Sequence, residues 1–169
     1  MTQEDKDLLL RDLCARLPYE VVGQCKIDAS YDTPFDTIPQ THKFNAVVYG
    51  VTEDLLVVSP MIENQDELEF ANEEIADGVD ILDFKPYLFP FSSITDEQKS
   101  ELNKKFNVQF SGNDIYSIHY HSEGYWDTDL ELDFQDWLWF INWCYKNHFD
   151  IYGLIPMELA IDATGLNVY

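Results

Sequence analysis

Residues 133–163 read DFQDWLWFINWCYKNHFDIYGLIPMELAIDA, and this stretch decides the fold. It contains three of the four tryptophans of the chain and begins with Asp133, a residue type that favours helix N-caps. The apolar spacing predicts a helix over residues 134–147. Gly153 and Pro156 then redirect the chain, which predicts a last short extended segment over residues 158–163.

The predicted helix has two faces of different character. At 100° per residue, one apolar arc predicts the core-facing side, and its members are Phe134, Trp137, Leu138, Ile141, Cys144, Tyr145 and His148. Trp139 and Trp143 lie one turn apart on the opposite side, flanked by Phe140. Large aromatic side chains on a wet face need a cover. Either another segment of the chain covers them, or they form an interface with a partner or a second copy.

The chain before this helix alternates between helical and strand patterns. Thr2 and Asp5 approximate a capping box and predict a helix over residues 3–16. Thr95 and Gln98 form a second capping box and predict a middle helix over residues 96–105. Residues 28–43 are rich in turn formers, which predicts a surface loop. Alternating runs predict strands at 19–27, 44–51, 55–59, 79–84 and within 107–132.

These elements predict one α+β domain over residues 1–169. Its mainly antiparallel sheet has about five strands, with N-terminal, middle and C-terminal helices packed against it. The N-terminus lacks the order of a signal peptide, and no apolar run approaches a membrane span. Both features predict a cytoplasmic protein. Cys14, Cys25 and Cys144 have no CxxC spacing and are expected to be reduced thiols in the core.

Net charge is the most unusual property of the chain. Ten basic residues against 32 acidic ones leave −22 at pH 7. This charge disfavours direct binding to nucleic acid or to an anionic membrane and favours a protein partner with a basic surface. Residues 60–78 form an acidic surface excursion, in which Leu68, Phe70 and Ile75 can hold a short helix against the body. Its acidic interaction candidates are Glu67, Glu69, Glu73 and Glu74.

Catalytic signals are weak. His119 and His121 are one residue apart on a predicted strand, so both imidazoles point to the same side, where Glu123 or Asp127 can add a carboxylate. Two histidines lack the further ligands that define a metal site. The chain has no phosphate-binding, nucleophile-elbow or zinc-protease motif. The sequence therefore indicates no cofactor and favours a non-catalytic role.

Three stretches resemble a known family. LLLRDLCARLPY at the start, VDILDFKPYLFPFSSITDEQK in the middle and WCYKNHFDIYGLIPMELAIDA at the end are similar to a family of small proteins from gut Bacteroidales and their mobile elements. The resemblance covers roughly a third of the chain, as judged from its motif lengths. It implies a bacterial, intracellular accessory protein and assigns no activity or site residue. The acidic stretch 60–78 and the segment with His119 and His121 depart from the family pattern.

The sequence leaves three functions open. The first is a non-catalytic interaction or accessory protein, which binds a basic protein or forms a homodimer through the aromatic helix. The second is an inhibitor that imitates the charge of nucleic acid and binds a basic DNA-binding protein. The third is a small metal-dependent enzyme that uses His119 and His121.

Overall fold

The chain folds into four helices and ten short or long strands in the part that the structure describes. The structure is a computed structural model, and it describes residues 2–32, 37–52, 55–106, 110–111, 114–115, 118–120, 126–128 and 132–169. The helices are α1 (Gln3–Arg16), α2 (Gln65–Glu74), α3 (Asp96–Phe106) and α4 (Phe134–Lys146). Three 3-10 turns are Leu17–Tyr19, Ile81–Asp83 and Phe91–Ser93. The strands are β1 (Val21–Asp32), β2 (Thr37–Val51), β3 (Leu55–Pro60), β4 (Val79–Asp80), β5 (Phe84–Leu88), β6 (Phe110–Ser111), β7 (Asp114–Ile115), β8 (Ile118–Tyr120), β9 (Trp126–Thr128) and β10 (Ile161–Asp162).

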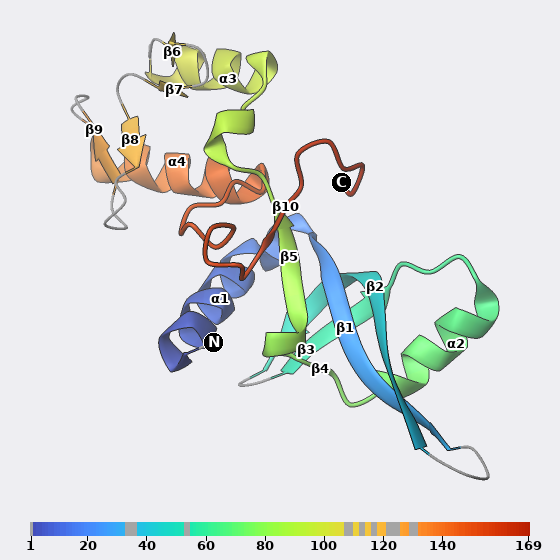
Figure 1. The fold of residues 1–169 in the computed structure, drawn as a ribbon. Coiled ribbons are helices and arrows are strands. Elements are labelled where there is room, and N and C mark those ends of the chain that lie inside the picture. The colour runs from blue at the N-terminus through green and yellow to red at the C-terminus, as the bar shows by residue number, and fades with distance from the viewer. Residues whose placement is uncertain are drawn as a thin grey trace.

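A curled six-stranded sheet in the order β10-β5-β1-β2-β3-β4 fills the lower right of Figure 1, and helices α3 and α4 lie in the upper left, beyond the β5–β10 edge. Its neighbouring strands are antiparallel except for β10 and β5, which are parallel. Strands β6 and β7 and strands β8 and β9 form two separate two-stranded ribbons. The predicted α+β class with a mainly antiparallel sheet is thereby confirmed, with one strand more in the sheet than expected.

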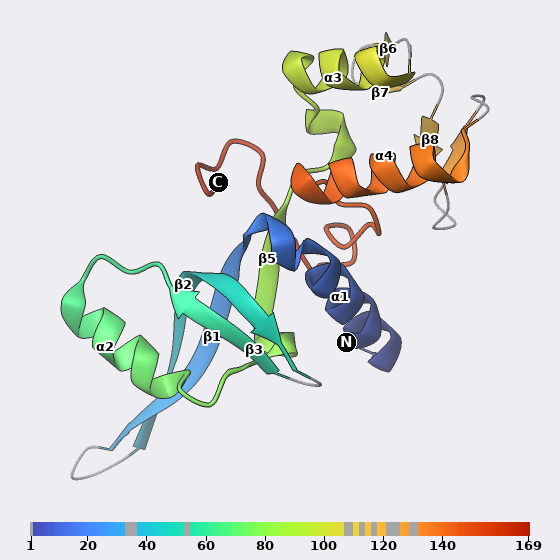
Figure 2. The same ribbon diagram turned by 180° about the vertical axis from the view of Figure 1, so that it is seen from behind.

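The long hairpin of β1 and β2 replaces a predicted loop. The prediction of a surface loop over residues 28–43 is wrong, because β1 continues to Asp32 and β2 begins at Thr37. Asp28 pairs with Thr41 and Ser30 pairs with Pro39. Residues 33–36 lie outside the described ranges. Both ribbon views show the hairpin extending past the other strands of the sheet (Figures 1 and 2).

Three helices begin where their capping residues predict. The Thr2 hydroxyl accepts from the Asp5 N–H and the Asp5 carboxylate accepts from the Thr2 N–H, so the N-terminal capping box is confirmed. The Gln98 side chain accepts from the Thr95 N–H, and the Thr95 hydroxyl accepts from the Gln98 N–H. Asp133 caps α4 by accepting from the N–H of Asp136. Local hydrogen bonds therefore fix these helix starts.

The core has two main clusters. The first lies between the inner face of the sheet and the flanking helices, and its fully buried members include Leu9, Leu13, Cys25, Leu56, Ile81 and Phe84. The second joins α3, α4 and the segment after α4, and its members include Leu102, Phe140, Trp143, Cys144, Phe149 and Ile151. Helices α1 and α2 lie on opposite sides of the long hairpin (Figures 1 and 2).

The buried face of α4 differs from the predicted one. Phe134 is 76% exposed and Leu138 is 45% exposed, whereas Phe140 and Trp143 are buried at 0% and 4%. The assignment of Phe134 and Leu138 to the core and of Trp143 to the wet face is therefore wrong. The physical reason is a second cover, because α3 packs along the tryptophan side of α4.

One of the three predicted core thiols is not in the core. Cys25 and Cys144 are buried, but Cys14 is exposed, because the buried face of α1 contains Leu9, Asp12 and Leu13 instead. All three cysteines are free. Within the described residues, the four helices are too short or too polar to cross a membrane.

Candidate functional site

The candidate site begins at the inner face of the β1–β2 hairpin, at the edge of the first core cluster. Side chains alternate between the two faces of a strand. Ile27 of β1 and the pair His42 and Phe44 of β2 therefore share the inner face with buried Cys25. The outer face receives Lys26 and Lys43, which stand directly opposite each other. The inner side chains are only partly buried, which leaves a surface for a second element to approach.

Helix α2 is that second element. Asn64 caps its N-terminus, and the Asn64 side chain accepts hydrogen bonds from the N–H groups of Asp66 and Glu67. Ala71 and Ile75 are buried at 1% and 7%, so they hold the C-terminal half of the helix against the body. The predicted short helix in the acidic excursion is confirmed. The cap and the two buried side chains anchor this helix, although seven of its ten residues are polar.

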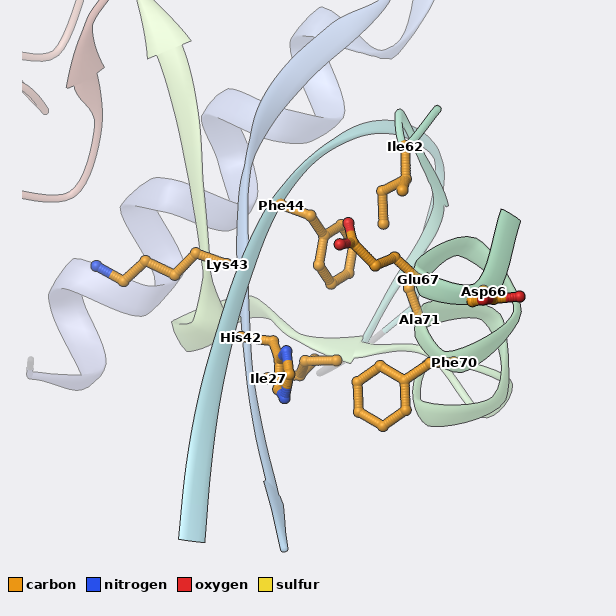
Figure 3. A pocket seen from close by; sticks show the side chains of 9 residues that line it. All are labelled: Ile27, His42, Lys43, Phe44, Ile62, Asp66, Glu67, Phe70 and Ala71. Carbon is orange, nitrogen blue, oxygen red and sulfur yellow. The ribbon is translucent and has the colours of Figure 1, made fainter. Parts of the chain in front are cut away.

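A groove of about 450 Å³ lies between α2 and the hairpin. It is lined by Ile27, His42, Lys43, Phe44, Ile62, Asp66, Glu67, Phe70 and Ala71. Figure 3 shows Glu67 and Phe70 extending from α2 toward the sheet. The His42 and Phe70 rings are in contact, with centroids 4.8 Å apart. The groove therefore has an aromatic and aliphatic floor, and its volume is within the range of ligand sites.

Negative charge dominates the helix side of the groove. Asp66 and Glu67 line it, and the other predicted acidic candidates Glu69, Glu73 and Glu74 are exposed on the same helix. The sequence has no Lys or Arg from residue 44 to residue 84. Lys43 touches the groove, but its side chain points away from α2 (Figure 3). The groove thus combines apolar contacts with the carboxylates of Asp66 and Glu67, neither of which forms an ion pair with the described residues, and this suits a ligand with long basic side chains.

The aromatic side of α4 is mostly used inside the chain. The Trp143 indole N–H donates to Glu101 of α3 at 2.9 Å, and its ring lies parallel to that of Trp139, with centroids 6.4 Å apart. Trp139 is half-buried and meets the Phe106 ring edge-on. Phe140 is fully buried. The sequence left two alternatives for these aromatic side chains, cover within the chain or an interface. Trp143 and Phe140 are covered by other segments of the same chain.

A shallow hollow of about 200 Å³ remains beside the tryptophans. It is lined by Tyr19, Glu101, Trp139, Asn142, Trp143 and Lys146. Glu101 is already hydrogen-bonded to the indole of Trp143, and Lys146 places a cation at the rim. The hollow is less than half the volume of the α2 groove, and its charges offset each other. It is therefore the weaker of the two candidate sites.

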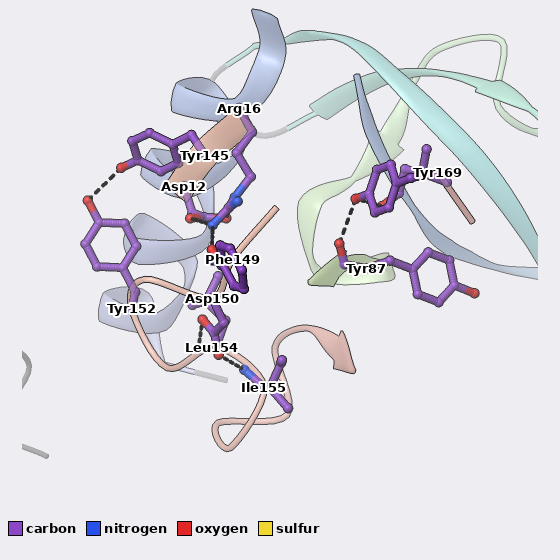
Figure 4. A network of polar contacts seen from close by, with 11 residues as sticks. Asp12, Arg16, Tyr87, Tyr145, Phe149, Asp150, Tyr152, Leu154, Ile155 and Tyr169 are labelled. Carbon is purple, nitrogen blue, oxygen red and sulfur yellow. Dashed lines mark hydrogen bonds and ion pairs between the residues drawn. The ribbon is translucent and has the colours of Figure 1, made fainter. Parts of the chain in front are cut away.

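A buried polar network connects α1 to the segment after α4 (Figure 4). Asp12 and Arg16 form a two-pronged ion pair at 2.7 and 2.9 Å, and both side chains are 0% exposed. Arg16 also donates to the Phe149 carbonyl at 2.6 Å. The Asp150 carboxylate accepts from the N–H groups of Leu154 and Ile155. Asp12 and Arg16 are fully buried and paired with each other, so this network stabilises the fold, although the Arg16 Nη1 atom has no hydrogen-bond partner among the described residues.

The buried thiols are unsuited to nucleophilic chemistry. Burial, together with the nearby charge of Asp83, raises the pKa of Cys25 to about 12. Burial likewise raises the pKa of Cys144 well above its usual range. A thiol must be deprotonated to attack, so both stay inert at neutral pH. In the part of the chain that the structure describes, no three His, Cys, Asp or Glu side chains are grouped as metal ligands.

Most of the predicted metal site lies outside the described residues. His119 belongs to β8 and pairs with Asp127 of β9 along the backbone. The side chains of this ribbon, and His121 and Glu123 altogether, lie outside the described residues. The metal hypothesis therefore stays a prediction.

Sequence reasoning identified one wall of the groove and missed the other. It singled out Glu67 and its acidic neighbours on α2, but it assigned His42 to a loop. It placed Ile27 and Phe44 on predicted strands without assigning them to a site. Residues 41–43 are all polar, so the sequence from Thr41 to Phe44 has no alternation that would reveal the strand. No protein-family model, no curated protein and no solved structure matches this chain.

Proposed function

We propose that this protein is a non-catalytic binding protein, and that the groove between α2 and the β1–β2 hairpin receives a basic segment of a protein partner. The observation that supports this most directly is the composition of the groove. Its floor is formed by Ile27, Phe44 and Phe70, and Asp66 and Glu67 line it from the helix side. Arginine and lysine side chains match both parts, because their stems pack on apolar surface while their charged ends reach carboxylates.

The charge of the whole chain supports the same kind of partner. At −22, the protein attracts basic surfaces over long distances and so increases the rate at which a cationic partner meets the groove. The same charge repels a second copy. A homodimer through α4 is less favoured for another reason too, because Trp143 is 4% exposed and bonded within its own chain. The resemblance to a Bacteroidales family adds support for an accessory role in a bacterium.

The test is binding of a defined basic probe. We would titrate the protein with an acetylated and amidated ten-residue peptide of alternating arginine and threonine, and measure heat of binding by calorimetry. The double variant Asp66→Asn, Glu67→Gln keeps the shape of the groove and removes two charges. Hydrogen bonds to charged groups are each worth about 1.5–3 kcal/mol, so we expect at least about tenfold weaker binding. Unchanged affinity in this variant would refute the assignment of the groove.

A charge-matched control separates this function from imitation of nucleic acid. Glu4→Gln, Glu158→Gln removes the same two charges at exposed positions away from the groove. A site-specific interaction leaves the affinity of this control near that of the wild type. Binding by a nucleic-acid mimic depends on the electrostatic field of the whole protein, so the two double variants would then bind the peptide equally weakly. Equal weakening would therefore favour the mimic over the groove.

A further inference from the structure

We infer that the partner's segment enters the groove as an extended strand and pairs with the free edge of β2 at Thr41 and Lys43. This inference rests on the proposed function and specifies how the same groove binds. It follows from the backbone rather than from the side chains. An uncovered strand edge presents unpaired N–H and C=O groups, and extended peptides bind such edges by adding a strand.

The free edge begins where β3 stops. Strand β3 pairs with β2 from Val51 back to Ala46, and the last contact is the bond from the Met61 N–H to the Asn45 carbonyl at 2.7 Å. The chain then turns away through residues 62–64 into α2. Within the described ranges, no strand pairs with β2 on this side beyond Asn45. On its other side β2 is paired with β1 from Thr37 to Val48.

The alternation of an antiparallel strand assigns the groups at this edge. The Asn45 carbonyl points toward β3. Lys43 and Thr41 lie two and four residues before Asn45, so their N–H and C=O groups point to the same side of β2. This direction explains how Lys43 can line the groove although its side chain points away (Figure 3). Its backbone forms part of the wall.

Pro39 supports the assignment and marks the end of the edge. Pro39 lies two residues before Thr41, so its backbone nitrogen also points away from β1. Because proline has no N–H, β2 lacks a donor on this unpaired side at that position. Proline is tolerated in a strand on such an unpaired side. The edge open to a partner therefore lies between Pro39 and Asn45, and its backbone donors are the N–H groups of Thr41 and Lys43.

The two faces of the sheet determine the pattern of the partner strand. On the inner face, its side chains would lie beside Phe44, Phe70 and Glu67. On the outer face they would lie beside the Lys43 ammonium. Basic side chains are therefore favoured on the inner face and uncharged ones on the outer face. The partner is an extended segment in which every second residue is Arg or Lys.

The experiment compares two substitutions at one position. Lys43→Pro removes the N–H at the edge and the ammonium, whereas the matched control Lys43→Gln removes only the ammonium. We expect the alternating arginine–threonine peptide to bind Lys43→Pro about tenfold more weakly than Lys43→Gln, the effect of losing about one hydrogen bond and its geometry. We also expect a helix-forming arginine–alanine peptide of equal charge to bind the wild type at least about tenfold more weakly than the alternating peptide.

Hydrogen exchange on the wild-type protein gives a readout that does not depend on the proline variant folding. Binding of the alternating peptide should slow exchange of the Thr41 and Lys43 amides. Unchanged exchange at both amides, or equal affinities of the two Lys43 variants, overturns strand pairing. The groove still stands as the proposed site if the Asp66→Asn, Glu67→Gln variant binds weakly in the same experiment. Absence of binding by both basic peptides overturns the proposed function itself.

Discussion

At the scale of single residues, the pair Asp12 and Arg16 is the most consequential interaction in the molecule. Both side chains are fully buried, and Arg16 bridges α1 to the carbonyl of Phe149 after α4. The Arg16 guanidinium also lies 5.1 Å from the centroid of the Tyr145 ring. The sequence pattern of α1 did not reveal this pair, because one acidic and one basic residue four apart usually lie on an exposed helix surface.

Replacing one member of the pair should lower the free energy of unfolding more than replacing both. Arg16→Met leaves the Asp12 carboxylate buried without its partner, so we expect a loss of about 3–5 kcal/mol in the free energy of unfolding. The double variant Asp12→Leu, Arg16→Met leaves no buried charge and should lose only about 1–3 kcal/mol, mainly from the unpaired Phe149 carbonyl. Urea denaturation measures both values. Equal losses in the single and double variants would contradict the burial of the pair.

His148 should make stability depend on pH. It is 8% exposed, and its ring stacks on that of Tyr169 at 3.7 Å. Burial and the positive charge of Arg16 lower the pKa of His148 from 6.5 to about 4. Between these values the unfolded chain binds a proton that the folded chain does not. The neutral, buried form of His148 therefore contributes fully to the free energy of unfolding above pH 6.5. About 3 kcal/mol of this contribution is lost as the pH falls from 6.5 to 4.

The variant His148→Asn isolates this effect from the many carboxylates. Asparagine accepts the positive φ of 56° at this position, so the backbone is kept. The difference in unfolding free energy between wild type and variant should shrink as the pH falls from 6.5 to 4. A difference that is constant over this range would show that His148 is not buried in its neutral form.

At the scale of elements, helix starts could be predicted from the sequence and helix faces could not. The caps at Thr2, Thr95 and Asp133 act within one turn of backbone, so local residues determine them. The buried face of α4 depends on what packs against it. The 3.6-residue pattern assumes cover from one side, but α3 adds a second cover over Trp139 and Trp143.

Two alanine substitutions test the face of α4. Phe140→Ala should lower the free energy of unfolding by about 3–5 kcal/mol, because Phe140 is fully buried. Phe134→Ala should change it by less than about 0.5 kcal/mol, because Phe134 is 76% exposed. Thermal or urea denaturation of the two variants gives the comparison. A larger loss for Phe134 than for Phe140 would restore the face that the sequence pattern predicts.

The two walls of the groove also differ in how well the sequence predicts them. Its acidic wall could be predicted in part, because Glu67 lies in a stretch without Lys or Arg, but Asp66, the other carboxylate of this wall, was not among the predicted candidates. Its strand wall could not, because Thr41 to Phe44 belong to a hairpin stabilised by pairing with residues 25–28 rather than by local propensity. The many turn-forming residues around Pro39 concealed this pairing.

At the scale of the whole molecule, charge influences both stability and recognition. A net charge of −22 on 169 residues repels itself in the compact state. Raising the salt concentration from about 0.01 to about 0.15 M shortens the screening length from about 30 to about 8 Å. We therefore expect the unfolding temperature, measured by circular dichroism, to rise over this range. A falling temperature would show that attractive ion pairs outweigh the repulsion.

The location of a bound basic segment tests the central claim most directly. Nuclear magnetic resonance of the ¹⁵N-labelled protein would follow each backbone amide during titration with the alternating arginine–threonine peptide. We predict that the largest shifts fall on residues 41–44 of β2 and 66–71 of α2, the two walls of the groove. Shifts concentrated around Phe134 and Leu138 of α4, or spread evenly over the acidic surface, would contradict the assignment of the groove as the binding site.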